Sequence, residues 1–213
     1  KKVELLLYQS TELDAPIWKS MPMTRGKQES SYHPANTHGV WILDFLGNLS
    51  GMAYQYRVHF EHHTQVTRDP YSIATTADGM RSAILSRADR QFDWGTKKGA
   101  DETPWRLDNP CQAVIYEMHL RDLTKSLTSG VDESLRGTYL GACQKGTVNS
   151  HGDATAFDYI RQLGVNVVQL QPISDRFKQY DEEGQVTYNW GYDVQNYSAP
   201  ETSFSTDSSN PKQ

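Results

Sequence analysis

The stretch from residue 113 to residue 170 constrains the fold of this chain more than any other feature. Residues 113–118 are a β-rich run, residues 153–164 carry apolar side chains at helical spacing, and residues 165–170 are a second strand-like run. Two strands joined through a helix within about 60 residues imply parallel strands and a right-handed crossover. The second half of the chain is therefore predicted to open an α/β domain.

The ends of the predicted helix follow from its flanking residues. Asp153 is placed to cap the start, and Gly164 is placed to end it, because glycine readily takes the left-handed conformation at helix ends. Pro172 then stops the second strand. The apolar positions of the helix are Ala156, Tyr159, Ile160 and Leu163.

The first hundred residues have no helical period and read as all-β. Strand candidates are residues 3–8, 40–45 and 53–60, the last of which alternates with Tyr54 and Tyr56 on one face. Short strands separated by Gly, Asn, Asp and Pro predict a small antiparallel sandwich. The polar run that begins at Gly95 is predicted to be a linker, so the chain is expected to be multi-domain.

Composition narrows the class of partner. The 213 residues are 37% hydrophobic and 22% charged, with a net charge of −5. The acidic balance argues against a nucleic-acid partner, which favours a basic stripe. No window reaches the roughly 18 consecutive apolar residues of a membrane span. Cys111 and Cys143 are the only cysteines, too few for a disulfide framework or a zinc ligand set.

The hexapeptide at residues 188–193, Tyr-Asn-Trp-Gly-Tyr-Asp, is the strongest functional signal. Aromatic faces beside hydrogen-bonding tips suit sugar rings, which present C–H faces edged with hydroxyls. The alternative is an aromatic turn that only packs against the rest of the domain. From these residues alone, both interpretations stay open.

Several ordered motifs resemble one family. Residues 92–95, 104–105 and 114–122 resemble the entry into the catalytic barrel of debranching enzymes of the alpha-amylase superfamily, glycoside hydrolase family 13. Residues 137–140 and 163–172 are similar to later elements of that barrel. The hexapeptide resembles an element typical of type I pullulanases. The resemblance covers nearly the whole chain, in the right order.

The first half carries its own resemblance. Residues 69–72 and 78–83 are similar to the signature of the starch-binding-like module, carbohydrate-binding module family 48, that precedes such barrels. The implied organisation is an immunoglobulin-like β-sandwich over residues 1–94, a linker over 95–110, and the first βαβ portion of a (β/α)8 TIM barrel over 111–213.

Two departures from the family pattern stand out. Val194 replaces the usual proline after the hexapeptide, which removes a fixed φ from that loop. The motifs expected for the third barrel strand and for the strands carrying the catalytic carboxylates would follow Gln213, and the first sandwich strand would precede Lys1. The chain is therefore expected to be a fragment at both ends.

For the parent enzyme, the resemblance implies hydrolysis of alpha-1,6 branch linkages in pullulan, starch or glycogen by a retaining mechanism, and an alpha-glucan partner. The chain alone is expected to be inactive, because it lacks the catalytic carboxylates. The resemblance implies no cofactor, and it is compatible with a bound Ca²⁺ in the parent enzyme. Oligomeric state is left open, as are extracellular and cytoplasmic locations, with a lean to the extracellular one. By resemblance, Tyr192 stacks on a glucose ring, Asp193 forms a hydrogen bond or ion pair, Asn189 and Trp190 shape the loop, and Tyr188 completes the substrate-binding set.

No catalytic residue is assigned within the chain. A retaining glycosidase needs two carboxylates about 5–5.5 Å apart. Asp122 lies near the end of the predicted first barrel strand, where such enzymes collect site residues, but an ion pair with Arg121 is the simpler interpretation. Residues 181–183 form a run of charged residues in a loop, and such a run is expected to be solvated rather than catalytic. The other local candidates are Glu117, Asp175 and Asp193.

Two further clusters are better explained without a ligand. His59, His62 and His63 gather near one strand, and a single strand rarely builds a metal site alone. Trp18, Trp41 and Trp94 could form a sugar-stacking platform on the sandwich, but core packing or contact between the domains is the better explanation. Alternative functions remain: a carbohydrate-binding module without catalysis, or a related glycogen debranching or branching enzyme.

Overall fold

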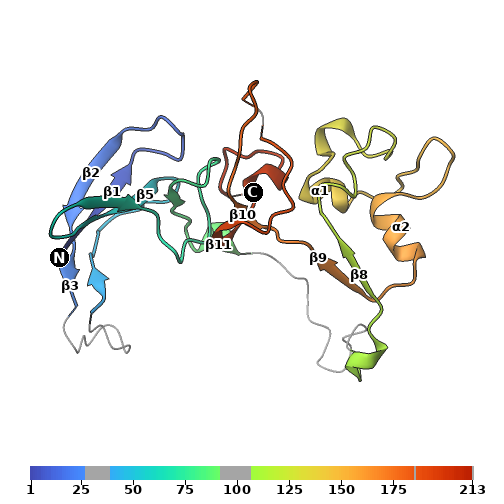
Figure 1. Ribbon diagram of the computed structural model, residues 1–213, viewed down its shortest axis with the longest axis horizontal. Helices are drawn as coiled ribbons and strands as arrows, with labels where there is room; N and C mark the ends of the chain where they lie inside the picture. Colours follow the sequence, from blue (N-terminus) through green and yellow to red (C-terminus); the bar gives the residue numbers. More distant parts are fainter. Residues whose placement is uncertain (27–38, 92–106, 185, 213) are drawn as a thin grey trace. The chain divides into compact units, whose positions relative to one another are not determined.

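The computed structural model describes residues 1–26, 39–91, 107–184 and 186–212 (Figure 1). It divides into two compact units. The first unit contains Lys1–Asp89, Asn196–Ala199 and Ser209–Lys212. The second contains Arg90–Gln195 and Pro200–Ser208. The predicted linker falls largely on residues that are not described, as do Trp94 and the motifs at 92–95 and 104–105. Within the described ranges, no helix is long and apolar enough to cross a membrane.

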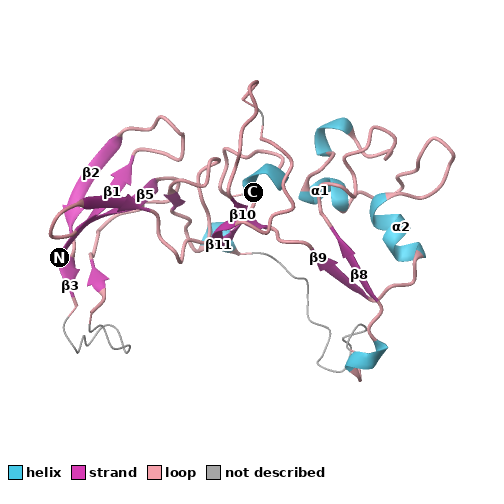
Figure 2. Ribbon diagram, in the orientation of Figure 1, coloured by secondary structure: helices cyan, strands magenta, loops and turns pink. Residues whose placement is uncertain are grey.

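The first unit is built on a five-stranded antiparallel sheet, drawn among the magenta strands of Figure 2. Its strand order is β2-β1-β5-β6, and β7 also pairs with β5. The strands are β1 (Lys2–Tyr8), β2 (Ile17–Pro22), β5 (Ala53–His59), β6 (Thr64–Thr67) and β7 (Ser82–Ala83). The predicted strands at 3–8 and 53–60 are thus confirmed to within a residue or two.

The register of β1 against β5 explains the core of this unit. Tyr8 lies opposite Ala53 and Leu6 opposite Gln55, so Leu6, Tyr8 and Ala53 share one face. With Ala15 they form a cluster in which each residue is at most 7% exposed. The Tyr8 hydroxyl donates to Gln55 Oε1 at 2.6 Å, so the buried phenol keeps a partner. Burial of a side chain such as Leu6 contributes about 1.5–3 kcal/mol.

A second, two-stranded sheet of this unit is shorter than the sequence indicates. β3 (Thr24–Arg25) pairs with β4 (Trp41–Ile42), whereas the apolar run predicts a strand over residues 40–45. The ladder stops at Ile42 because β3 offers only two residues to pair with. Leu46 is fully exposed beyond it. The mostly β content of the unit is consistent with a β-sandwich domain.

The second unit contains the predicted strand–helix–strand arrangement. β8 (Ile115–Met118) and β9 (Val167–Leu170) are parallel, in register from Ile115 with Val167 to Met118 with Leu170. The helix α2 (Ala156–Gln162) lies between them in the chain (Figure 1). The prediction of parallel strands joined through a helix is therefore confirmed. A short helix that the sequence did not indicate, α1 (Tyr139–Ala142), lies in the preceding loop.

The start of α2 differs from the prediction. Thr155 is the N-cap residue, and Asp153 lies before the helix. Asp153 instead pairs with Asn149, whose Nδ2 donates to Asp153 Oδ2 at 3.0 Å and whose Oδ1 accepts the Asp153 N–H at 3.0 Å. Such local side-chain bonds compete with helix capping. The predicted end is correct, since Gly164 has φ +72° directly after the C-cap Leu163.

The remaining elements precede and follow the candidate site along the chain. β10 (Ser174–Arg176) pairs with β11 (Val194–Pro200). The ladder continues on both sides, because the Phe177 N–H donates to the Asp193 carbonyl and the Glu201 N–H donates to the Ile173 carbonyl. Four 3-10 turns complete the described part of the chain: η1 (Ala88–Arg90), η2 (Pro110–Gln112), η3 (Glu133–Leu135) and η4 (Thr202–Phe204).

The core of the second unit lies where β8 ends. Met118, Leu120, Ala142 and Phe204 are each at most 9% exposed and form one cluster. Phe204 presents its ring edge-on to Tyr139 at a centroid distance of 5.8 Å. This core anchors the loop after β8 and the η4 turn, which both contact the candidate site.

Candidate functional site

The loop at residues 188–193, called the aromatic loop below, is held in shape by hydrogen bonds from its own side chains. The Gly191 N–H donates to Asn189 Oδ1 at 2.7 Å. Asn189 Nδ2 donates to both carboxylate oxygens of Asp193, at 2.8 and 3.0 Å. Asparagine commonly builds turns in this way. The structure therefore brings Asn189 and Asp193 together, and it assigns Asn189 the loop-shaping contact that the sequence predicts.

Gly191 is required by the geometry of this loop. Its φ is +92°, a conformation that other residues rarely adopt. A Cβ at this position would lie 2.7 Å from the carbonyl oxygen of Pro172. The tight turn predicted from Gly191 is confirmed, and the close approach to Pro172 fixes the loop against the end of β9.

The three aromatic rings of the loop are exposed to different degrees. Tyr188 is 51% exposed, Trp190 is 59% exposed and Tyr192 is 63% exposed. Tyr192 makes no ring contact with another described residue. In the described part of the chain, each of the three rings thus keeps an exposed face.

Tyr188 is held more firmly than its exposure suggests. Its hydroxyl donates to Asp122 Oδ2 at 2.5 Å, and this bond is the main reason why the pKa of Tyr188 is raised. The Arg121 guanidinium lies 5.4 Å from the centre of the Tyr188 ring. Arg121 also pairs with Asp122 at 3.3 Å, so the predicted ion pair is confirmed. Asp122 thus ties the loop after β8 to the aromatic loop.

His119 is a site residue that the sequence reasoning missed. It directly follows β8, is 6% exposed, and places Nδ1 3.5 Å from Asp122 Oδ1. Its ring lies 5.6 Å from that of Tyr188 and 5.7 Å, edge-on, from that of Phe204. Burial lowers the pKa of His119, against the opposing effect of Asp122. The signal that could have found it is its position at the C-terminal end of a parallel strand.

A cluster of buried charged residues contacts the backbone of the aromatic loop through Arg176. Its members are Asp175, Arg176, Lys178 and Glu201. Lys178 Nζ lies 2.7 Å from Asp175 Oδ1 and 3.5 Å from Glu201 Oε1, and each of these three side chains is at most 4% exposed. Arg176 donates from Nη1 to the Asn189 carbonyl at 2.5 Å. This cluster fixes the backbone of the aromatic loop, and the sequence pattern gave no signal for it.

The other carboxylates considered from the sequence have structural partners. Glu117 Oε1 accepts a bond of 3.4 Å from Gln171. The 181–183 run is exposed, as predicted, and Asp181 Oδ1 accepts the Glu183 N–H in a turn. These contacts give none of them a catalytic geometry.

In the described ranges of the first unit, the histidines contact other side chains rather than one another. His59 Nε2 lies 3.2 Å from Glu4, and His63 stacks on Phe60. Among the described residues, no group of three or more His, Cys, Asp or Glu side chains could hold a metal ion. Cys111 and Cys143 are free and exposed.

The tryptophans expected on the sandwich are only partly described. Trp18 is 42% exposed and packs edge-on against Phe45 at 6.0 Å, while Lys19 Nζ lies 4.3 Å from the Trp18 ring centre. Trp41 is half-buried in β4. The described contacts of Trp18 are packing contacts.

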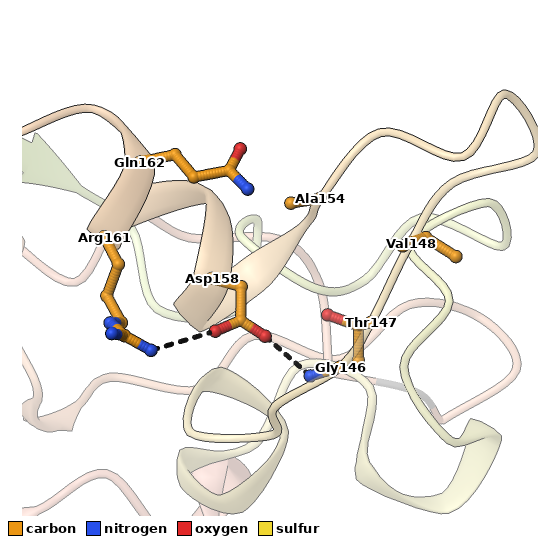
Figure 3. Close-up of a pocket in the computed structure, with 7 residues that line it drawn as sticks. All are labelled: Gly146, Thr147, Val148, Ala154, Asp158, Arg161 and Gln162. Carbon is orange, nitrogen blue, oxygen red and sulfur yellow. Dashed lines mark hydrogen bonds and ion pairs between the residues drawn. The ribbon is translucent and has the colours of Figure 1, made fainter.

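A hollow of about 410 Å³ on α2 is separate from the aromatic loop (Figure 3). Asp158 accepts the Gly146 N–H at 2.6 Å and pairs with Arg161 at 3.6 Å, so its carboxylate is already engaged. The hollow has no aromatic side chain to stack on a sugar. Its lining residues are Gly146, Thr147, Val148, Ala154, Asp158, Arg161 and Gln162.

Known proteins that are similar in sequence carry names that agree with the resemblance of the motifs. No family model matches the chain. The chain is 33% identical over 175 residues to "Pullulanase" of Bacillus subtilis (strain 168), covering 82% of this chain and 23% of that protein. It is 30% identical over 191 residues to "Isoamylase 1, chloroplastic" of Oryza sativa subsp. japonica, covering 80% and 22% respectively. The chain thus spans less than a quarter of the length of these curated relatives.

Solved structures agree with the curated relatives. The chain is similar to the crystal structure of pullulanase from Paenibacillus barengoltzii in complex with maltohexaose and alpha-cyclodextrin, with a TM-score of 0.83 and 35% identity. That alignment covers 100% of this chain and 30% of the other. Over most of its length, the chain is therefore similar to one part of proteins named pullulanase and isoamylase.

Proposed function

We propose that the protein acts in the hydrolysis of alpha-1,6 branch linkages in pullulan, starch or glycogen. The observation that carries this proposal is the match of the whole chain to a pullulanase that was crystallised with maltohexaose and alpha-cyclodextrin. Pullulanases and isoamylases among the relatives both support debranching. The isoamylase match also keeps a second candidate, a related debranching enzyme that is not a pullulanase.

The proposed role of the second unit is to grip the glucan. Tyr192 stacks on a glucose ring, which shields one sugar face from water. Asp193 offers its remaining acceptor lone pairs to the neighbouring hydroxyls, Asn189 shapes the loop, and Tyr188 and Trp190 flank the glucan. Supporting this role, Tyr192 is 63% exposed and Asn189 holds the loop in one conformation.

The proposed domain organisation follows the resemblance. Residues 1–94 form an immunoglobulin-like module similar to carbohydrate-binding module family 48, residues 95–110 a linker, and residues 111–213 the first portion of a (β/α)8 barrel. The parallel pairing of β8 with β9 through α2 supports the barrel assignment. In such a barrel, the loops after β8 and β9 would lie on the face where catalytic residues gather.

Hydrolysis with retention would use one carboxylate as nucleophile and one as acid and base. We assign neither role to a described residue. The residues of this chain bind and orient: Asp122 holds Tyr188 through a charge-assisted bond, and His119 buttresses both. Arg176 keeps the loop carbonyl of Asn189 in place. Fixed positioning of this kind lowers the entropic part of a barrier.

Isothermal titration with maltotriose tests the glucan site. Tyr192→Ala should weaken binding by about five-fold or more, since an aromatic contact contributes roughly 1 kcal/mol beyond its area. Tyr192→Phe should retain most of the affinity, because the ring provides the stacking. Tyr159→Ala is the matched control, since Tyr159 is an exposed tyrosine on α2. Equal affinity in Tyr192→Ala and the control would remove the stacking assignment.

A further inference from the structure

A cationic cavity of about 120 Å³ lies beside the aromatic loop in the second unit. Four basic side chains line it: Arg121, Lys125, Arg136 and Arg176. Tyr188 lines it as well, so the cavity and the aromatic loop share a residue. In a chain with a net charge of −5, four cations around one small cavity are a local reversal of the overall charge.

Two of these cations are not compensated. Asp122 pairs with Arg121 at 3.3 Å, and Glu201 lies 3.9 Å from Arg176. Neither Lys125 nor Arg136 forms an ion pair with another described residue. Arg136 donates from Nε to the Val131 carbonyl at 3.0 Å, which leaves its two terminal nitrogens available. The uncompensated positive charge around the cavity therefore favours the binding of an anion.

Arg176 supplies a second, independent indication. Its side chain is 4% exposed, yet its Nε has no hydrogen-bond partner in the described part of the chain. A buried donor without a hydrogen-bond partner is unfavourable, and an anion in the cavity that Arg176 lines would stabilise its guanidinium electrostatically. The hydroxyl of Ser203, on the same wall, makes no hydrogen bond with a described residue and could donate to the same anion.

We propose that this cavity binds a phosphate group, either as free inorganic phosphate or as a monoester carried on a glucan. A phosphate carries more charge than a carboxylate and offers three or more strong acceptor oxygens, which suits several converging cations. Guanidinium groups match phosphate geometry through paired N–H donors. The glucan-borne alternative rests on the proposed function, since it requires the sugar to lie on the aromatic loop while its phosphate enters the cavity past Tyr188.

Titration of the intact chain with inorganic phosphate at constant ionic strength, followed by ³¹P NMR, tests the cavity directly. Saturable binding is expected, and Lys125→Gln should weaken it about five-fold, as for loss of one nearby charge in a water-exposed setting. Lys145→Gln is the matched control, since Lys145 is exposed and lies over Phe157 instead. Arg136→Gln should weaken binding further. Circular dichroism verifies that each variant is folded.

Absence of saturable binding, or equal weakening by Lys125→Gln and Lys145→Gln, would overturn the proposal. Titration with neutral maltotriose and with maltotriose 6-phosphate separates the two sources of phosphate. A glucan-borne phosphate predicts that the phosphorylated sugar binds more tightly than either neutral maltotriose or inorganic phosphate. Equal affinity for phosphate and the phosphorylated sugar assigns the cavity to the free ion. Loss of maltotriose binding alone counts against the proposed function and leaves the cavity intact.

Discussion

Replacing Lys178 with methionine tests whether the buried charge cluster stabilises the second unit. Lys178 lies 2.7 Å from Asp175 and 3.5 Å from Glu201, and these carboxylates are at most 1% exposed. Methionine has a similar length and no charge, so Lys178→Met leaves the cluster with one cation and two carboxylates. Breaking a buried ion pair in this way typically costs about 3–5 kcal/mol, because an uncompensated charge stays in a low-dielectric interior.

Hydrogen exchange followed by mass spectrometry is the suitable assay, because it reports stability for each segment of a two-unit chain. Peptides covering β10 and η4 should lose protection by about two to four orders of magnitude in exchange rate, which corresponds to this free energy. Lys212→Met is the matched control, since it removes a half-exposed pair with Asp89 in the first unit. That change should cost at most about 1 kcal/mol.

A double variant sharpens the interpretation. Asp175→Asn combined with Lys178→Met restores charge balance between Arg176 and Glu201, so it should recover part of the lost protection. Protection in Lys178→Met that falls by less than about ten-fold, or no recovery in the double variant, would refute the view that unbalanced buried charge is the cause.

Two further predictions concern the loop and the first unit. Gly191→Ala should abolish maltotriose binding while the far-ultraviolet circular dichroism stays unchanged, because the added Cβ meets the Pro172 carbonyl oxygen at a backbone φ of +92°; wild-type affinity would contradict the steric argument. Hydrogen bonds from Lys2 and His59 lower the pKa of Glu4 from 4.5 to about 2. A depressed carboxyl pKa stabilises the fold above pH 4.5, and this contribution is lost as the pH falls toward 2. Thermal unfolding of Glu4→Gln should therefore show a weaker dependence on pH in that range, and parallel profiles for the two proteins would count against it.

The sequence predicted those elements whose pattern is local and periodic. The β8–α2–β9 unit was expected because two strand-like runs flank a segment of helical period. The end of the helix was expected at Gly164, because glycine adopts the left-handed conformation there without strain. The contact between Asn189 and Asp193 is also local, at a spacing of four positions, but the sequence analysis did not predict it. Asp153 misled the prediction because its carboxylate has a second local partner, Asn149, and sequence alone does not rank the two.

The parts that escaped prediction depend on pairing across long separations. Glu201 lies 25 residues after Arg176, and it reaches Arg176 only because β10 pairs with β11. His119 becomes a site residue only when Tyr188 and Phe204 cover it. The strand expected at residues 40–45 ended early because its partner β3 is short, a fact that no property of the run itself reveals.

The distribution of the first unit along the chain bears on the order in which the protein is made. Asn196 donates to the Gly79 carbonyl across 117 residues, and Lys212 reaches Asp89. A ribosome adds about 5–20 residues each second, so Gly79 waits roughly 6–25 s for this partner to be synthesised. Closing so long a loop also adds an entropic barrier. During translation, the first unit thus stays incomplete until much of the second unit has been made, and chaperones have that interval in which to engage it.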